Sequence, residues 1–215
     1  MAASTRAVTF DLFGTLVRVE RPADPARAVA DALAERDVTV PEGFERAYRE
    51  PQVDAPDYAE VPLPAHVATA LGALGVDAPP LVVRRATVAA LSPDPAAVHT
   101  LAGAPEAVAA AADRGPVGVL SDCSVPGLAR QVLTASDVDR DHLDAVTTSA
   151  GCGWRKPHRG AFEAAARQLD CPPESLVHVG DDPDADGGAA TLGATFVDVA
   201  DTPLADLPAH LEGLG

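Results

Sequence analysis

From His99 onward, short apolar segments alternate with segments of helical character, and this alternation constrains the fold more than any other feature of the chain. A further apolar segment stands near the N-terminus, directly before Asp11. Strands that alternate with helices predict an α/β fold built on a doubly wound, parallel sheet. The predicted strands are residues 8–10, 117–120, 145–148, 176–179 and 195–199. Helices are predicted at residues 105–114, 125–134 and 159–169 and again after Asp181, and the C-terminal stretch is polar with no predicted element.

The stretch between residues 18 and 99 departs from this alternation. It has no apolar run of strand type, and residues 50–64 form a loop rich in Pro and Asp. We therefore predict a Rossmann-like core made of residues 1–17 and 100–215, with residues 18–99 inserted as a small helical cap. The predicted cap helices are residues 24–38, 41–48, 64–74 and 80–91.

The chain is strongly acidic, and this narrows the classes of partner. Its 215 residues carry a formal net charge of −16. Such a surface repels polyanions, so we expect no nucleic acid and no membrane as partners, and a small-molecule substrate instead. Asp outnumbers Glu, and Lys156 is the sole lysine, which favours a halophilic protein adapted to a salt-rich cytosol.

Cysteine usage and the N-terminus predict the compartment. The 3 cysteines are too few and too scattered for a disulfide framework or a zinc site. The first residues do not resemble a secretory signal, and no apolar segment approaches the ~20 residues that a membrane span needs. We expect a cytoplasmic protein in a reducing environment.

Polar residues stand where the apolar segments end. Asp11, Ser121 and Asp181 each follow or close such a segment, and Lys156 lies on a predicted loop. Ligands of an open parallel sheet bind outside the carboxyl ends of its strands, so these residues are expected to converge. Taken singly, each has a structural alternative as a helix cap, a turn residue or a surface charge. His178 lies inside a strand and is expected to be a buried, hydrogen-bonded core residue.

Taken together and in order, these segments resemble the four motifs of the haloacid dehalogenase superfamily of hydrolases. The resemblance extends from about residue 7 to about residue 199, except in the cap, which matches only by position and helical content. The matching residues are Phe10-Asp11-Leu12-Phe13-Gly14-Thr15-Leu16, Ser121, Arg155-Lys156-Pro157 with Phe162, and Val177-His178-Val179-Gly180-Asp181 with Asp186.

The resemblance implies roles for three of these residues. Asp11 is implied as the covalent nucleophile, which splits one difficult displacement into two easier steps. Ser121 is implied as a hydrogen-bond donor to the transferring group. Lys156 is implied as the charge that neutralises Asp11 and the developing negative charge, a position that suits a compact ammonium group.

The fourth motif adds carboxylates that need a cation. Two unit charges 4 Å apart repel by about 4 kcal/mol at an effective dielectric constant near 20, and one lysine cannot offset several such pairs. We therefore predict a Mg²⁺ site at Asp11 and Asp181, because Mg²⁺ binds carboxylates together with substrate phosphate oxygens. By resemblance, the Phe13 carbonyl is a further ligand and Asp186 lies beside the ion. Asp182 receives no role.

Phe13 leaves more than one activity open. Phosphatases of the superfamily usually carry an acidic Asp at this position, whereas dehalogenases carry an aromatic residue. Because the fourth motif matches the metal-binding members, our first hypothesis is a Mg²⁺-dependent phosphomonoester hydrolase that acts on a small anionic molecule through an aspartyl-phosphate. The alternatives are a metal-independent 2-haloacid dehalogenase and a degenerate, non-catalytic binding protein.

The source of the leaving-group proton is a further open question. His66 and His158 are candidate substitute acids. In the cap, Arg21, Arg27 and Arg46 could bind an anionic substrate, but solvated helix faces explain them equally well. Neither the identity of the substrate nor the oligomeric state follows from the sequence.

Overall fold

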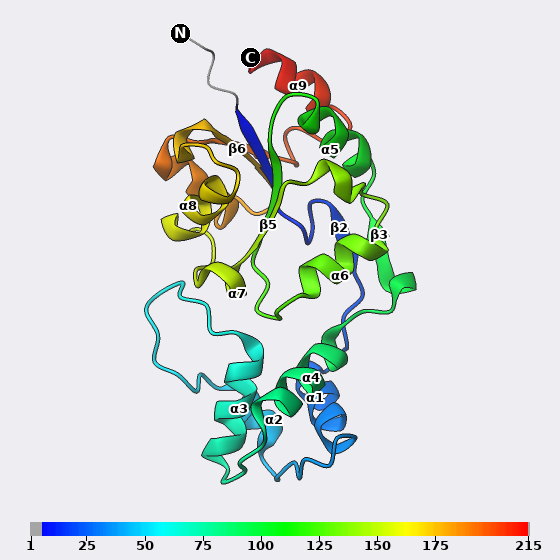
Figure 1. The fold of residues 1–215 in the computed structure, drawn as a ribbon, viewed down its shortest axis with the longest axis vertical. Coiled ribbons are helices and arrows are strands. Elements are labelled where there is room, and N and C mark those ends of the chain that lie inside the picture. Colours follow the sequence, from blue (N-terminus) through cyan, green and yellow to red (C-terminus); the bar gives the residue numbers. More distant parts are fainter. Residues whose placement is uncertain (1–5, 215) are drawn as a thin grey trace.

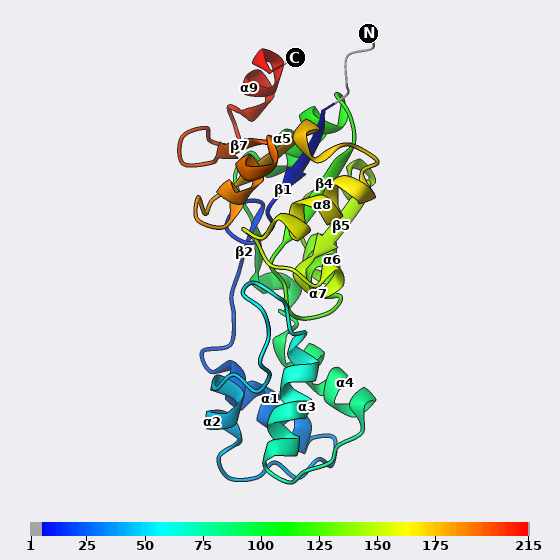
Figure 2. The same ribbon diagram turned by 90° about the vertical axis from the view of Figure 1, so that its left-hand side faces the viewer.

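The computed structural model describes residues 6–214. The molecule is elongated, with the sheet-containing core at one end and the cap helices at the other (Figures 1 and 2). Both described chain ends lie at the far end of the core, away from the cap (Figure 1). The chain passes from core to cap and back, so the cap is an insertion in the core.

The core contains a five-stranded sheet in the order β5-β4-β1-β6-β7, and all neighbouring strands are parallel. The central strand β1 is buried on both faces, as expected for a strand of a parallel sheet that reads as a continuous apolar run. The predicted doubly wound α/β fold is confirmed. The strands are β1 (Ala7–Phe10), β4 (Val117–Ser121), β5 (Ala145–Thr148), β6 (Leu176–Gly180) and β7 (Thr195–Asp198).

Helices cover both faces of this sheet. On one face, Val8, Phe10 and their strand neighbours pack against α5 (Ala104–Ala112), α6 (Leu128–Ala135) and α9 (Leu207–Gly213). On the other face, the strand residues that alternate with these pack against α8 (Arg159–Gln168) and the 3₁₀ helix η4 (Asp186–Leu192). This alternation follows from the two-residue period of a strand. The short elements are α7 (Ser149–Cys152), η1 (Pro95–Ala97), η2 (Arg140–His142) and η3 (Pro173–Ser175).

The cap has a hydrophobic core of its own. Phe44, Leu33 and Leu71 are among its buried side chains. The first cap helix begins where the side chain of Asp24 accepts a hydrogen bond from the Arg27 N–H, and a proline occupies the first turn. The cap helices are α1 (Pro25–Ala34), α2 (Phe44–Arg49), α3 (Leu63–Ala73) and α4 (Pro80–Leu91).

Two short strands carry the chain between core and cap. Strand β2 (Val17–Val19) pairs antiparallel with β3 (Val98–Thr100). The predicted domain boundaries, 17/18 and 99/100, fall inside this pair. Sequence patterns did not indicate these strands, because three residues are too few to show the alternation of a strand.

The loop at residues 50–62 bends back from the cap to the core and lies beside α7 (Figure 1). The Glu60 N–H donates to the Gly153 carbonyl at 2.9 Å, and the Arg155 N–H donates to the Tyr58 carbonyl at 2.8 Å. The Ser149 hydroxyl donates to the Glu60 carboxylate at 2.6 Å. The cap is therefore joined to the core segment that directly precedes Lys156.

Three local predictions need correction. The helix expected after Asp181 is the 3₁₀ helix η4, and the helix expected from residue 125 begins only at Leu128. Gly127 has a φ of 87°, in the left-handed region, so the helix cannot extend backward through it. The polar C-terminal stretch forms α9, which packs through Leu207 and Leu211.

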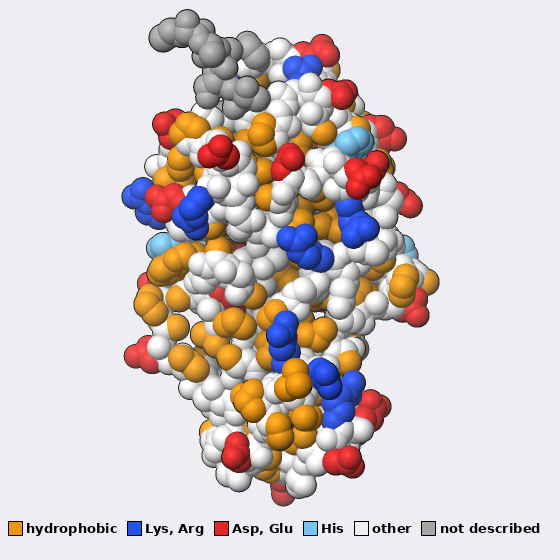
Figure 3. Space-filling model, viewed as in Figure 1, with side chains coloured by type: hydrophobic (Ala, Val, Ile, Leu, Met, Phe, Trp, Pro, Cys, Tyr) orange, Lys and Arg blue, Asp and Glu red, His pale blue; other side chains and the backbone are white. Residues whose placement is uncertain are grey.

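Acidic side chains on the surface are not confined to one site (Figure 3). On the face shown in Figure 3, acidic side chains are spread over both core and cap. Within residues 6–214, no helix combines the length and the apolar character needed to cross a membrane.

The cap core generates a stability prediction. Phe44 is 1% exposed, so Phe44→Ala should lower the free energy of unfolding by about 3–5 kcal/mol through lost burial and a residual cavity. Leu81, which is 56% exposed, is the control, and Leu81→Ala should change stability by about 0.5 kcal/mol or less. Denaturant unfolding measures both. Equal losses for the two variants would contradict this account of the cap.

Candidate active site

A cavity of about 230 Å³ opens at the carboxyl ends of β1, β4 and β6. Asp11 follows β1, Ser121 closes β4 and Asp181 follows β6, so the parallel order of the sheet brings these three residues to one edge. Lys156 joins them from the loop before α8. The cavity is lined by Asp11, Phe13, Arg21, Ser121, Asp122, Lys156, Asp181, Asp182, Ala185 and Asp186.

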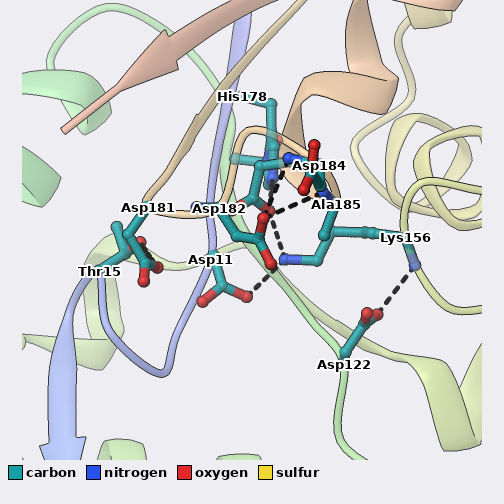
Figure 4. A network of polar contacts seen from close by, with 11 residues as sticks. Asp11, Thr15, Asp122, Lys156, His178, Asp181, Asp182, Asp184 and Ala185 are labelled. Atoms are coloured by element: carbon teal, nitrogen blue, oxygen red, sulfur yellow. Dashed lines mark hydrogen bonds and ion pairs between the residues drawn. The ribbon is translucent and has the colours of Figure 1, made fainter. Parts of the chain in front are cut away.

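Lys156 bridges two carboxylates. Its Nζ lies 2.6 Å from Asp11 Oδ1 and 2.5 Å from Asp186 Oδ1, and the residue is 5% exposed (Figure 4). Burial alone would lower the pKa of Lys156, but the two carboxylates outweigh it and the pKa is raised. The alternative of a solvated surface lysine does not apply, because this ammonium group is buried and charged.

Asp11 is an acid held away from water. It is 6% exposed, and burial is the main reason that its pKa is raised to about 6. The carboxylates of Asp186 and Asp181 raise the pKa further, whereas Lys156 opposes the shift. Unless a cation other than Lys156 is bound at the site, the ionised form of Asp11 is therefore destabilised.

Asp186 anchors Lys156 rather than standing free. Its Oδ1 accepts from Lys156 and, at 2.9 Å, from His178 Nε2, and its Oδ2 accepts from the Asp182 N–H at 3.1 Å. Burial would raise the pKa of Asp186, but these hydrogen bonds and charges hold it well below its usual range. Because both oxygens are engaged, we do not include Asp186 among the proposed metal ligands.

His178 is fully buried and hydrogen-bonded, as predicted, but it also supports the site. Burial lowers the pKa of His178, so the imidazole is neutral. Since ionised Asp186 can only accept, Nε2 donates to it and Nδ1 accepts from the Thr9 hydroxyl at 2.9 Å. The sequence signal for this role was a polar residue, His178, inside an otherwise apolar strand. Its position opposite Thr9, on the face of the sheet that bears no valine, is seen only in the structure.

Asp181 and Asp182 have different partners. The Thr15 hydroxyl donates to Asp181 Oδ1 at 2.7 Å. Gly14 has a φ of 100°, and a side chain there would overlap the Asp181 carboxylate. Asp182 Oδ1 accepts from the N–H of Asp184 at 3.0 Å, so Asp182, which had no assigned role, stabilises the turn before η4 (Figure 4).

These residues fit a Mg²⁺ ion held by few protein ligands. Among residues 6–214, no group of three or more His, Cys, Asp or Glu side chains has the arrangement of a metal cage. Mg²⁺ does not require one, because it usually takes one or two carboxylates and keeps water and substrate oxygens. Asp11 and Asp181 line the same cavity. The turn after Phe13 uses the carbonyls of Leu12 and Val17, which leaves the Phe13 carbonyl available.

Ser121 lacks a partner where a ligand would provide one. The residue is fully buried, and its Oγ has no hydrogen-bond partner within the described part of the chain. A buried hydroxyl without a partner costs about 1–3 kcal/mol. Because Ser121 lines the cavity, a bound group with an acceptor oxygen would remove this cost.

The two histidines considered as proton donors lie outside the cavity. His66 Nε2 is 2.7 Å from the Tyr48 carbonyl, and His158 Nδ1 accepts from the Gly160 N–H at 3.1 Å. Asp122 is the cavity residue whose role sequence reasoning left open. It lines the cavity, and its Oδ1 accepts from the Lys156 N–H at 3.0 Å. The available signal was its position directly after Ser121.

Comparison with known proteins identifies the family. The model of the haloacid dehalogenase-like hydrolase family matches residues 5–192. The chain belongs to this family, and it is a hydrolase. No curated protein is similar enough in sequence to count as a match.

Solved structures share the fold at low sequence identity. The 2-haloacid dehalogenase from Pseudomonas syringae pv. Tomato DC3000 is 20% identical, with a TM-score of 0.69 over 98% of this chain and 99% of that one. A predicted phosphoglycolate phosphatase from Haemophilus somnus 129pt is 15% identical, with a TM-score of 0.59 over 98% and 100%. The HAD-hydrolase YfnB from Bacillus subtilis, bound to magnesium, is 15% identical, with a TM-score of 0.53 over 90% and 88%. Both dehalogenases and phosphatases therefore have this architecture.

The raised pKa of Asp11 generates a stability prediction for the metal-free protein. The group titrates at about 6 in the folded state and near 3.9 when unfolded, so its ionised form costs up to about 3 kcal/mol. In the wild-type protein, the contribution of Asp11 to the free energy of unfolding is fully present below about pH 4, where the group is protonated. This contribution is lost as the pH rises through about 6. Asp11→Asn should therefore stabilise the protein at about pH 8 and much less at about pH 4.

Urea unfolding in EDTA at both pH values measures this difference. The control is Asp137→Asn, since Asp137 is an exposed acid outside the cavity. An Asp11→Asn variant that is no more stable than wild type at the higher pH would contradict the prediction.

Proposed function

We propose that this hydrolase is a Mg²⁺-dependent phosphomonoesterase that acts on a small anionic molecule through an aspartyl-phosphate at Asp11. One observation carries the proposal: the cavity wall holds five aspartates against Lys156 and Arg21. Lys156 is already shared by Asp11 and Asp186, and Asp181 has no basic partner among the described residues. A hard divalent cation supplies the missing charge.

The proposed metal ligands are Asp11, Asp181 and the Phe13 carbonyl. Bound Mg²⁺ would offset the charge of these carboxylates and of the phosphate oxygens. It would also favour the ionised form of Asp11, which burial opposes. The nucleophile and the metal thus depend on each other electrostatically.

The side chains of the cavity divide the remaining tasks. Asp11 attacks phosphorus, and the bond to the leaving-group oxygen breaks as the aspartyl-phosphate forms. Lys156, held by Asp186, orients Asp11 and offsets negative charge on the transferring group. The Ser121 hydroxyl, which has no partner in the described protein, donates to a phosphate oxygen. Water then hydrolyses the intermediate and restores Asp11.

Asp122 is the candidate source of the leaving-group proton. It lines the cavity without taking part in the Asp11–Lys156–Asp186 group. Asp122 is an exposed residue as a whole, but partial burial of its carboxyl group raises its pKa, which favours the protonated form more than in a fully solvated Asp. The phosphate of a bound substrate would raise this pKa further, because it adds negative charge nearby.

Phe13 supports a second candidate function, that of a 2-haloacid dehalogenase. An aromatic residue on the cavity wall cannot donate a proton, and a halide leaves without one. The similar structure from Pseudomonas syringae is a 2-haloacid dehalogenase. In this reading the uncompensated Asp181 has no task, so the phosphatase is the better-supported proposal.

Chelation separates the two candidates. If the proposal is correct, EDTA should abolish hydrolysis of phosphate esters, Mg²⁺ should restore it, and 2-haloacids should not be turned over. Asp181→Asn should mimic chelation and weaken Mg²⁺ binding measured by calorimetry, because it removes one of two carboxylate ligands. Asp11→Asn should abolish turnover altogether.

Asp184→Asn is the matched control for Asp181→Asn, because Asp184 is an exposed acid in the same loop that does not line the cavity. It should retain Mg²⁺ binding and activity. Full activity toward 2-haloacids in EDTA would establish the dehalogenase instead.

Asp122 is tested by the leaving group. Asp122→Asn keeps an oxygen that can accept from the Lys156 N–H but has no acidic proton. Turnover of alkyl phosphates should fall by about 10²–10⁴-fold, while aryl phosphates, which leave without full protonation, should be affected far less. The measurement is kcat/KM for both ester classes. An equal loss for both would show that Asp122 does not donate the proton.

A further inference from the structure

A second cavity, of about 220 Å³, lies between cap and core beside the catalytic cavity. Its cap wall includes Tyr48, Leu63 and Leu91, and its core wall includes Val125 and Leu128. A dry apolar cavity of about 150 Å³ is large enough to bind benzene. This cavity therefore has room for a benzene-sized group with a small substituent.

The two cavities share three wall residues, Phe13, Arg21 and Asp122. A molecule whose phosphate lies against Ser121 and Lys156 would therefore extend past these residues to place its organic part in the apolar cavity. The order of groups along such a molecule is phosphate, leaving-group oxygen and apolar body.

Arg21 is the cation at this junction. Its guanidinium carbon lies 5.2 Å from the centre of the Phe13 ring, a cation–π contact that holds the planar group beside both cavities. Within the described chain, no carboxylate lies within ion-pair distance of Arg21. By contrast, Arg27 Nε lies 2.9 Å from Asp31 and Arg46 Nε lies 3.8 Å from Glu50.

The charged residues around Arg21 determine which kind of group it can bind. Lys156 is occupied by Asp11 and Asp186, so Arg21 is the remaining cation on either cavity wall within the described residues. A second anionic group on the substrate would lie close to the acidic wall of the catalytic cavity and would be repelled unless a cation received it. The planar fork of a guanidinium matches a carboxylate through two parallel hydrogen bonds.

We propose that the substrate is a phosphate monoester with a compact apolar body and a carboxylate, and that Arg21 binds this carboxylate where the two cavities meet. The proposal rests on the phosphatase function proposed above and names its substrate class. It separates Arg21 from Arg27 and Arg46, which the sequence alone left equivalent.

Benzyl phosphate and its 2-carboxy derivative test the proposal, because they differ in a carboxylate that lies next to the ester oxygen, where the two cavities meet at Arg21. With Mg²⁺, the wild-type enzyme should prefer the carboxylated ester in kcat/KM. Arg21→Gln should raise KM for this ester by roughly tenfold to a hundredfold, the range expected when hydrogen bonds to a charged group are lost, with a much smaller effect on kcat. Its effect on benzyl phosphate should be small, and Arg21→Lys should restore part of the preference.

Arg27→Gln is the matched control, since it removes a paired arginine from the exposed face of the cap, and both esters should behave as with wild type. Equal losses for both esters in Arg21→Gln would show that Arg21 binds the phosphate, which overturns the proposal. No change in Arg21→Gln overturns it as well.

Binding of benzoate, followed by NMR or calorimetry, gives a readout that needs no turnover. Benzoate should bind the wild-type protein, and Arg21→Gln should weaken it about tenfold or more. Leu91→Trp, which fills the apolar cavity from the cap side, should also weaken it. If benzoate binds in this way but no phosphate ester is hydrolysed, the phosphatase function fails while the Arg21 site stands. If esters are hydrolysed but benzoate does not bind, the Arg21 site fails alone.

Discussion

The ammonium group of Lys156 lies between the carboxylates of Asp11 and Asp186, and these three side chains are almost completely withdrawn from water. Removing Lys156 would leave two buried carboxylates without a compensating charge, at a cost of about 3–5 kcal/mol, whereas without Asp11 the ammonium group is still paired with Asp186. The group therefore holds the loop of Lys156 against the end of β1 and the start of η4. It also sets the ionisation of Asp11, since Lys156 opposes the upward shift that burial imposes on the Asp11 pKa.

The rest of the core is arranged to support this group. Asp186 is fixed by a hydrogen bond from His178, and His178 accepts one from Thr9 in the central strand. The chain of hydrogen bonds thus runs from the middle of the sheet to Asp11. From the other side, the cap loop binds the segment before Lys156 through Glu60. A small displacement of the cap would therefore shift the segment that holds Lys156.

The two neighbouring cavities differ in charge and polarity. The catalytic cavity is acidic, and the neighbouring cavity is largely apolar. Arg21 and Asp122 lie at the boundary, where an ester oxygen would pass from one environment to the other. In a family whose similar structures include dehalogenases and phosphatases, these boundary residues are where the chemistry of this chain is expected to be selected.

The sequence by itself determined the order of strands and helices, the insertion of a helical segment, and the family. It did so because periodicity and strand-end motifs are local properties of the chain. It also pointed to Asp11, Ser121, Lys156 and Asp181, since the ends of parallel strands must meet at one edge.

Only the tertiary structure decided which charges pair. It assigned Asp186 to Lys156, distinguished Arg21 from Arg27, and placed Asp122 in the cavity and His66 outside it. The β2–β3 pair and α9 also emerged only in three dimensions. The physical reason is that the partner of a buried charge and the lining of a cavity depend on contacts between residues far apart in the chain, and no local pattern records them.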